Sequence, residues 1–297
     1  MNKIRKISDN SSSENALVSI GMPVYNEERF VEQAIVSILI QDYKNFELII
    51  SDNASTDQTK KICLEYSKKD SRIRFYSQDT TTDAATNFNY VASIAQGDFF
   101  MWASGHDTRD SAFISRCVEK FEKSDSIILC YSDAIWIDLN GNKIGNEQSD
   151  IDTVGMDKIK RLKKVFWNLG YAYPIYGLFR KDILDTVLPT QRVLGSDIIL
   201  LNELSAIGEF ARIPEPLFNI RKLSDYGDWH AYFQKSLNIK LNRKKAIGLF
   251  FEFIMKNYQA VRKYTESPKE KLVIMKLFLF DSFLKYHWIL TGFIRLK

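Results

Sequence analysis

"LVSIGMPVYNEERFVEQAIVSILIQDYKNFELIISDNASTDQT" spans residues 17–59 and decides the fold. A short apolar run ends at Pro23, and a second run, FELIISD, occupies residues 46–52. Between them, residues 28–41 carry apolar side chains at the spacing of one helical face. A strand, an amphipathic helix and a second strand in this order predict a βαβ unit.

The same alternation continues along the chain. Ser55 with Gln58 resembles a capping box and predicts a helix that ends near Ser67. Further elements are expected as strands at 73–78, 98–103 and 126–133 and as helices over 84–95 and 111–123. The predicted fold class is therefore α/β, with a mainly parallel central sheet flanked by helices and a helical, basic C-terminal appendage.

Polar clusters stand where three of these strands end. They are Pro23–Glu27, Ser51–Asn53 and Ser104–Asp107. Because the carboxyl ends of parallel strands share one edge of a sheet, and ligands bind beyond that edge, the clusters predict a single site.

Composition and charge divide the chain. The 297 residues are 45% hydrophobic and 26% charged, and the net charge is +4. Residues 235–297 carry fourteen Lys and Arg against four Asp and Glu, whereas the remainder carries 27 against 33. We expect a disordered tail over 1–16, a catalytic domain over 17–222 and a helical region over 223–297. The basic region is expected to meet an anionic partner, and a solvated basic face is the alternative.

Several functional classes lack their motifs. There is no G-x-G-x-x-G after a strand, no P-loop, no H-E-x-x-H, no G-x-S-x-G and no zinc-type cysteine spacing. Three histidines exclude a histidine-rich metal centre, and three cysteines suit buried thiols in a reducing cytosol. No apolar run approaches the ~20 residues of a membrane-spanning helix. We expect a cytoplasmic protein without a nucleic-acid partner.

Residues 17–59 closely resemble the opening of the family-2 glycosyltransferases, which have the A-type nucleotide-sugar fold. The matching elements are P-x-Y-N-x-E, a helix ending in S-I-L-x-Q, and S-D-N-x-S-T-D. The resemblance continues through NFNYVASIAQGDFFMW and GSDIILLNELSAIGEFARIPEPLF and covers roughly residues 17–221.

The resemblance implies a nucleotide site. Tyr25 offers a flat face for a base, and Asp52 offers an acceptor for the N3–H of uracil. Asp57 is assigned to a helix cap, and each nucleotide contact has a structural alternative as a packed or strand-ending residue. The implied nucleotide contacts are Pro23, Tyr25, Glu27, Asp52, Asn89 and Arg221.

The resemblance also implies a cation. Family members carry a D-x-D-type motif in the region of WASGHD, and its carboxylates hold a divalent ion at the donor diphosphate. This chain keeps Asp107 and has His106 where another aspartate is usual. Imidazole suits Mn²⁺ better than Mg²⁺. We expect Mn²⁺ or Mg²⁺ on Asp107 and His106, and a motif that holds no metal is the alternative.

Asp197, in GSDIILL, matches the family position of the catalytic base. The implied activity is inverting transfer of a sugar from a nucleotide-sugar, expected to be UDP-linked, to an acceptor hydroxyl in bacterial surface glycan or glycolipid assembly. A catalytically silent sugar-nucleotide-binding module and a sugar nucleotidyltransferase are the alternatives.

The C-terminal stretch KLVIMKLFLFDSFLKYHWILTGFIRLK, residues 271–297, mixes apolar, aromatic and basic side chains. This pattern suits an interfacial helix at the inner face of the plasma membrane, where lipid-linked acceptors reside. A helix packed on the catalytic domain or in a homo-oligomer is the alternative.

Overall fold

The computed structural model describes residues 16–190, 192–223 and 242–294. The expected tail over 1–16 thus lies outside the described residues, apart from Ala16. Contacts divide the chain into two units. The sheet unit comprises Met1–Gln148, Tyr173–Leu188 and Ala211–Lys222, and the helical unit comprises Ser149–Ala172, Pro189–Phe210 and Leu223–Lys297. This interleaved grouping differs from a single boundary after residue 222.

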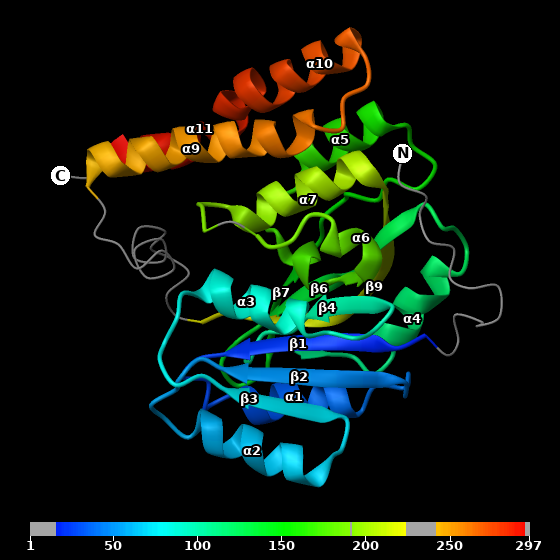
Figure 1. Ribbon diagram of the computed structural model, residues 1–297, viewed down its shortest axis with the longest axis vertical. Coiled ribbons are helices and arrows are strands. Elements are labelled where there is room, and N and C mark those ends of the chain that lie inside the picture. The colour runs from blue at the N-terminus through cyan, green and yellow to red at the C-terminus, as the bar shows by residue number, and fades with distance from the viewer. Residues whose placement is uncertain (1–15, 191, 224–241, 295–297) are drawn as a thin grey trace. The chain divides into compact units, whose positions relative to one another are not determined.

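The sheet unit contains a nine-stranded sheet in the order β3-β2-β1-β4-β8-β6-β9-β5, with β7 paired to β6. Its strands are β1 (Val18–Val24), β2 (Phe46–Asp52), β3 (Ile73–Ser77), β4 (Phe99–Trp102), β5 (Thr108–Arg109), β6 (Ile127–Ile137), β7 (Lys143–Glu147), β8 (Leu178–Arg180) and β9 (Glu209–Arg221). The first four are parallel, and Figure 1 shows β1, β2 and β3 side by side. The carboxyl ends of β1 and β2 are level, because Val24 pairs with Asp52.

The other half of the sheet is antiparallel. β4 and β6 each pair antiparallel with β8, β6 with β7, and β5 with β9. A tight turn at Asp138–Asn142 joins β6 to β7, and its backbone N–H groups bond to the Asp138 carboxylate. Such a short connection permits only antiparallel neighbours. The α/β class with a central sheet flanked by helices is confirmed, and the sheet is mixed in strand direction.

The helices of the sheet unit largely follow the predicted apolar spacing. In α1 the buried positions include Val31, Ile35 and Ile38. The helical segments are α1 (Val31–Leu39), α2 (Thr59–Lys69), α3 (Ala84–Ser93), α4 (Phe113–Phe121), the short 3₁₀ segment η2 (Tyr173–Tyr176) and α6 (Lys181–Asp185). The three cysteines are buried free thiols, as predicted.

The predicted capping box at Ser55 and Gln58 is wrong. α2 begins at Thr59, and Gln58 makes no side-chain cap bond. The Ser55 hydroxyl accepts the Asn26 N–H instead, while Asp57 Oδ1 accepts the Thr59 N–H. A contact between two loops therefore replaces the local bond that the sequence suggested.

The helical unit has its own apolar core. Its segments are α5 (Lys158–Asn168), α7 (Ser196–Ile207), α9 (Arg243–Arg262), α10 (Pro268–Met275), the π-helical turn η4 (Lys276–Phe280) and α11 (Asp281–Ile294). The Phe166 ring packs edge-on against Phe278 and Tyr286, and Phe253 also contacts Tyr286. Figure 1 shows α9 beside α10 in this unit. No described helix is long and apolar enough to span a bilayer.

Candidate active site

Two loops follow β1 and β2 and are bonded to each other. The Asn26 N–H donates to Ser55 Oγ over 2.9 Å, and Asn26 Oδ1 accepts the Thr56 N–H over 2.9 Å. Asn26 and Ala54 have left-handed backbones, with φ of 55° and 57°. A left-handed conformation is costly for alanine. The bonds between the loops hold this geometry at the carboxyl edge of the sheet.

The start of α1 is anchored to the same second loop. The Glu27 N–H donates to Thr59 Oγ1 over 2.7 Å, and the Glu28 N–H donates to Asp57 Oδ2 over 3.1 Å. Gln58 returns a bond from its N–H to Glu28 Oε2 over 2.9 Å. Asp57 therefore orders the two loops and the start of α2, in keeping with its structural assignment.

Pro23 and Asp52 stand at the ends of β1 and β2. The pairing of β1 with β4 ends at Gly21, two residues before Pro23. Proline has no N–H to donate, and at this position β4 is no longer alongside to accept one. Asp52 is fully buried. Its Oδ2 accepts the Ser55 N–H over 3.3 Å, whereas its Oδ1 has no partner among the described residues. A buried acceptor without a donor is uncommon in a folded protein, and it makes Asp52 a candidate ligand contact.

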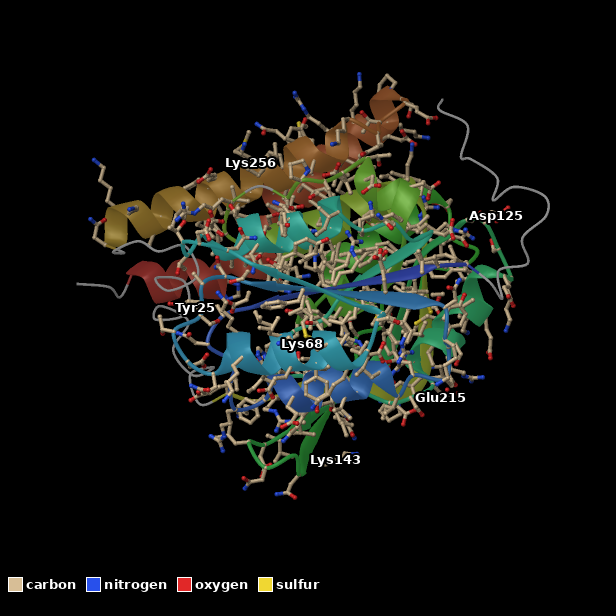
Figure 2. All side chains as sticks on the ribbon, turned by 60° about the horizontal axis from the view of Figure 1, so that its bottom comes forward. Tyr25, Lys68, Asp125, Lys143, Glu215 and Lys256 are labelled. Carbon is tan, nitrogen blue, oxygen red and sulfur yellow. The ribbon has the colours of Figure 1, made fainter. Side chains whose placement is uncertain are left out.

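Tyr25 comes directly after the last residue of β1, and it is 43% exposed. Figure 2 shows its side chain at the edge of the sheet unit opposite the labelled Asp125, which precedes β6. The carboxyl edge therefore offers an aromatic face next to the strand end that carries Asp52.

α3 is fixed to this edge by an asparagine that the sequence did not single out. Asn87 is buried, its Oδ1 accepts the Ser51 hydroxyl over 2.6 Å, and its Nδ2 donates to the Ser51 carbonyl over 3.0 Å. The predicted Asn89 lies two residues further along α3 and is half-buried, and its nucleotide contact stays a prediction. Asp83 caps the helix by accepting the Thr86 N–H.

The segment after β4 folds around Asp107, which is 4% exposed. Asp107 Oδ2 accepts the Ser104 hydroxyl over 2.6 Å, and Oδ1 accepts the Arg221 N–H over 2.8 Å. The neighbouring His106 places Nδ1 at 2.9 Å from Glu27 Oε1. Two predicted site residues from different strand ends, Glu27 and His106, are therefore in direct contact.

Opposing influences act on the pKa of His106. Burial is the largest and lowers the pKa, but the bond to Glu27 and the negative charges of Asp107 and Glu27 raise it, against a smaller lowering by Arg221. The net pKa of His106 is above its ordinary value. The protonated ring is thus favoured by its acidic neighbours.

Arg221 is committed to internal bonds. Its Nε donates to the His106 carbonyl, its Nη1 to the Asp138 carbonyl and its Nη2 to Gln33 Oε1, each over 2.9 Å. The guanidinium lies 4.4 Å from the centre of the Phe30 ring, and the residue is 1% exposed. Burial lowers the pKa of Arg221. The predicted contact with a diphosphate stays a prediction, and these bonds favour a structural part.

His106 and Asp107, after β4, are the predicted cation ligands, and this assignment stays a prediction. Among the described residues, no group of three or more His, Cys, Asp and Glu is placed to hold a metal. Each Asp107 oxygen accepts one hydrogen bond and retains a second lone pair, and the contact at Nδ1 leaves His106 Nε2 as the ring atom that could bind a cation. Two protein ligands fit an ion that is completed by substrate phosphates and water.

Asp197 belongs to the helical unit, in the first turn of α7. Its Oδ1 accepts the Ile198 N–H over 2.9 Å. Burial raises the pKa of the Asp197 carboxyl, while backbone N–H groups act in the opposite direction. Gly195 precedes the helix with φ of 65°, and a Cβ there would lie 2.8 Å from the Phe253 ring. A carboxyl with a raised pKa is suited to accept a proton.

The fold is thus an α/β protein with a mixed sheet, and polar loops lie at the carboxyl edge of its parallel half. The profile described as "Glycosyl transferase family 2" matches residues 19–188, more than half of the chain. The chain therefore belongs to glycosyltransferase family 2, and the predicted family is confirmed.

Curated relatives match over part of their length. An uncharacterized glycosyltransferase of Haemophilus influenzae is 34% identical over 134 residues, which is 43% of this chain and 51% of the relative. The GalNAc(5)-diNAcBac-PP-undecaprenol beta-1,3-glucosyltransferase of Campylobacter jejuni is 25% identical over 189 residues, 62% of this chain and 58% of the relative. This chain thus spans between half and three fifths of the length of these relatives.

Solved structures share the fold. S. aureus TarS 1–349 in complex with UDP-GlcNAc aligns with a TM-score of 0.67 at 15% identity, covering 91% of this chain and 73% of TarS. The mannosyltransferase PcManGT of Pyrobaculum calidifontis, in complex with GDP-Man and Mn²⁺, aligns with a TM-score of 0.59 at 14% identity, covering 94% and 73%. At these identities the likeness establishes the fold alone.

Proposed function

We propose that this protein is an inverting glycosyltransferase that moves a sugar from a UDP-sugar to an acceptor hydroxyl in bacterial surface glycan or glycolipid assembly. The observation that carries the proposal is the buried Asp52 Oδ1, which has no partner among the described residues, at a strand end level with the one that precedes the exposed Tyr25. A carboxylate acceptor complements the N3–H of uracil, and an exposed ring provides a stacking face for the base.

Asp197 is proposed as the base that takes the proton of the acceptor hydroxyl while its oxygen attacks the anomeric carbon. A single displacement inverts that centre and needs no covalent sugar–enzyme intermediate. The raised pKa of Asp197 supports this part, because its carboxylate then holds a proton more readily. Pro23, Glu27, Asn89 and Arg221 remain proposed parts of the nucleotide site.

His106 and Asp107 are the residues that would hold a divalent cation, Mn²⁺ or Mg²⁺. When bound, such an ion supplies positive charge at the leaving diphosphate. The Mn²⁺ in the complex of PcManGT supports a cation in this fold. The Ser104 hydroxyl and the Arg221 N–H each donate to one oxygen of the Asp107 carboxylate and fix its orientation.

A lipid-linked or glycan acceptor is proposed, with peripheral contact between the helical unit and the inner face of the plasma membrane. Exposed apolar side chains on α9 to α11 support this membrane contact. Two of them, Phe251 and Phe283, pack together with their ring centroids 5.8 Å apart. The others are Met255, Leu272, Phe280 and Leu284. Residues 243–294 carry ten Lys and Arg against four Asp and Glu, which suits an anionic lipid surface. A contact between two copies of the chain is the alternative.

UDP release from a panel of UDP-sugars, with and without Mn²⁺, tests the proposal. We expect turnover with one of the UDP-sugars. We also expect the coupling constant of the product's anomeric proton, measured by NMR, to show inversion. If the protein binds UDP-sugars but turns none of them over with any acceptor tested, it is a silent binding module. Release of pyrophosphate from a nucleoside triphosphate and a sugar phosphate would indicate a nucleotidyltransferase.

A further inference from the structure

We infer that Glu27 is a positioning residue that fixes the tautomer and orientation of the His106 ring, so that Nε2 points to the cation site. The inference rests on the divalent cation of the proposed function. It gives Glu27 a part beyond a contact with the nucleotide.

The contact between the two side chains is close and sheltered. Glu27 Oε1 lies 2.9 Å from His106 Nδ1, and the side chains are 19% and 17% exposed. The backbone at Gly105 lies close to the Glu27 side chain. A Cβ at Gly105 would lie 2.9 Å from Glu27 Cγ and 3.1 Å from Val24 Cγ1. The glycine therefore lets the His106 segment approach the stem of Glu27.

Both partners are held independently of each other. The Glu27 N–H donates to Thr59 Oγ1, and its carbonyl accepts the N–H groups of Phe30 and Val31. The His106 carbonyl accepts Arg221 Nε. The backbones of Glu27 and His106 are thus fixed by different elements, and the bond between their side chains does not have to organise the loops.

The chemistry of the pair follows from what each atom can do. An ionised carboxylate only accepts hydrogen bonds, so in the neutral ring the proton must be on Nδ1 and the lone pair on Nε2. Metal-bound histidines ordinarily donate their second ring N–H to a carboxylate, carbonyl or water in this way. An aspartate at position 106 has no tautomers, whereas a histidine binds a cation through Nε2 only when its proton is on Nδ1.

The first experiment reads the tautomer without metal. The chain has three histidines, and ¹⁵N NMR of histidine-labelled full-length protein, with His106 assigned by His106→Gln, reports which ring nitrogen carries the proton. At a pH where the ring is neutral, we expect Nδ1–H in the wild type. Glu27→Gln offers both an oxygen and an N–H to Nδ1 and should populate both tautomers, and Glu27→Ala should release the ring toward the Nε2–H form of free imidazole.

A matched control is Glu32→Gln. This glutamate lies on α1 and accepts a hydrogen bond from the Tyr66 hydroxyl rather than from His106. Its loss should leave the His106 signals unchanged. An Nε2–H tautomer in the wild type, or a His106 spectrum that is the same in Glu27→Ala, would overturn the inference.

The second experiment measures Mn²⁺ affinity by EPR in the presence of UDP. Glu27→Ala should weaken Mn²⁺ binding by about 10- to 100-fold, as loss of a ligand's hydrogen-bond partner does. Glu27→Gln should weaken it less, and adding Glu27→Ala to His106→Ala should have no further effect. Equal Mn²⁺ affinity in Glu27→Ala and wild type overturns this inference alone. Wild-type protein that binds UDP but no Mn²⁺ overturns the proposed cation and the inference with it.

Discussion

Replacing Asp52 by Asn should weaken UDP binding and at the same time stabilise the free protein. Asp52 is fully buried, and among the described residues its carboxylate accepts one long bond, 3.3 Å from the Ser55 nitrogen to Oδ2. A neutral amide costs less to bury than a carboxylate with an unpaired oxygen. The amide nitrogen of the Asp52→Asn variant would still be unpaired, so the gain in stability should be smaller than the cost of such an orphan, about 1–3 kcal/mol. Each kcal/mol shifts the melting temperature of a domain this size by about 2–4 °C.

The loss in binding follows from the same atom. A hydrogen bond to a charged acceptor contributes about 1.5–3 kcal/mol, so the Asn variant should bind UDP about 10- to 150-fold more weakly. Calorimetry with UDP and thermal melts without it measure the two effects. Asp125→Asn is the control, because that side chain is 79% exposed and lies at the far end of the sheet. Wild-type UDP affinity in a folded Asp52→Asn variant would refute the assignment of the uracil acceptor.

Three further predictions concern the base, the membrane and a buried glutamate. Asp197→Asn should leave UDP affinity nearly unchanged and reduce turnover by about 10²-fold or more, measured as UDP release. Flotation with anionic vesicles should recover the wild type better than neutral vesicles do, and Phe251→Ser with Phe283→Ser should reduce the recovery. Burial alone would raise the pKa of Glu47, but bonds from the Ser19 hydroxyl, Arg74 and the Gln96 N–H outweigh it and leave the pKa lowered. Its stabilising effect should therefore be complete above the unfolded pKa of about 4.3 and disappear as the pH falls through the lower folded value, so the difference in unfolding free energy between wild type and Glu47→Gln shrinks in acid.

Each of these has an outcome that contradicts it. Normal turnover by Asp197→Asn would remove it as the base. If neutral and anionic vesicles recover the protein equally, and Phe251→Ser with Phe283→Ser does not change the recovery, the membrane contact of α9 and α11 is wrong. A Glu47→Gln effect that stays constant from about pH 7 to about pH 3.5 would show that the charge of Glu47 does not contribute.

The sequence predicted the parallel half of the sheet because its signals are local. β1 and β2 are buried along their whole length, and apolar spacing marks α1. The antiparallel half has weaker signals. β8 has three residues, and the five residues of β7 are exposed or half-buried. Strands of this kind are defined by their pairing with β6, which local periodicity does not encode.

The edge that carries the site could be predicted, but the partners within it could not. Parallel strand ends must coincide, so Tyr25, Asp52 and Asp107 were expected together. The bond from His106 Nδ1 to Glu27 Oε1 joins positions 79 residues apart, and the bond from the Arg221 N–H to Asp107 joins positions 114 apart. These pairings follow from the fold and not from any spacing in the chain.

Unfavourable local features gather at the carboxyl edge of the sheet. Asn26 and Ala54 adopt left-handed backbones, and Asp52 Oδ1 is buried without a donor. Features of this kind each cost about 1–3 kcal/mol and persist only where the surroundings enforce them. The bonds between the loop after β1 and the loop after β2 provide that enforcement before any ligand arrives. A nucleotide that supplies the missing donor would recover part of the cost on binding, which is why these features favour a ligand site over a purely structural turn.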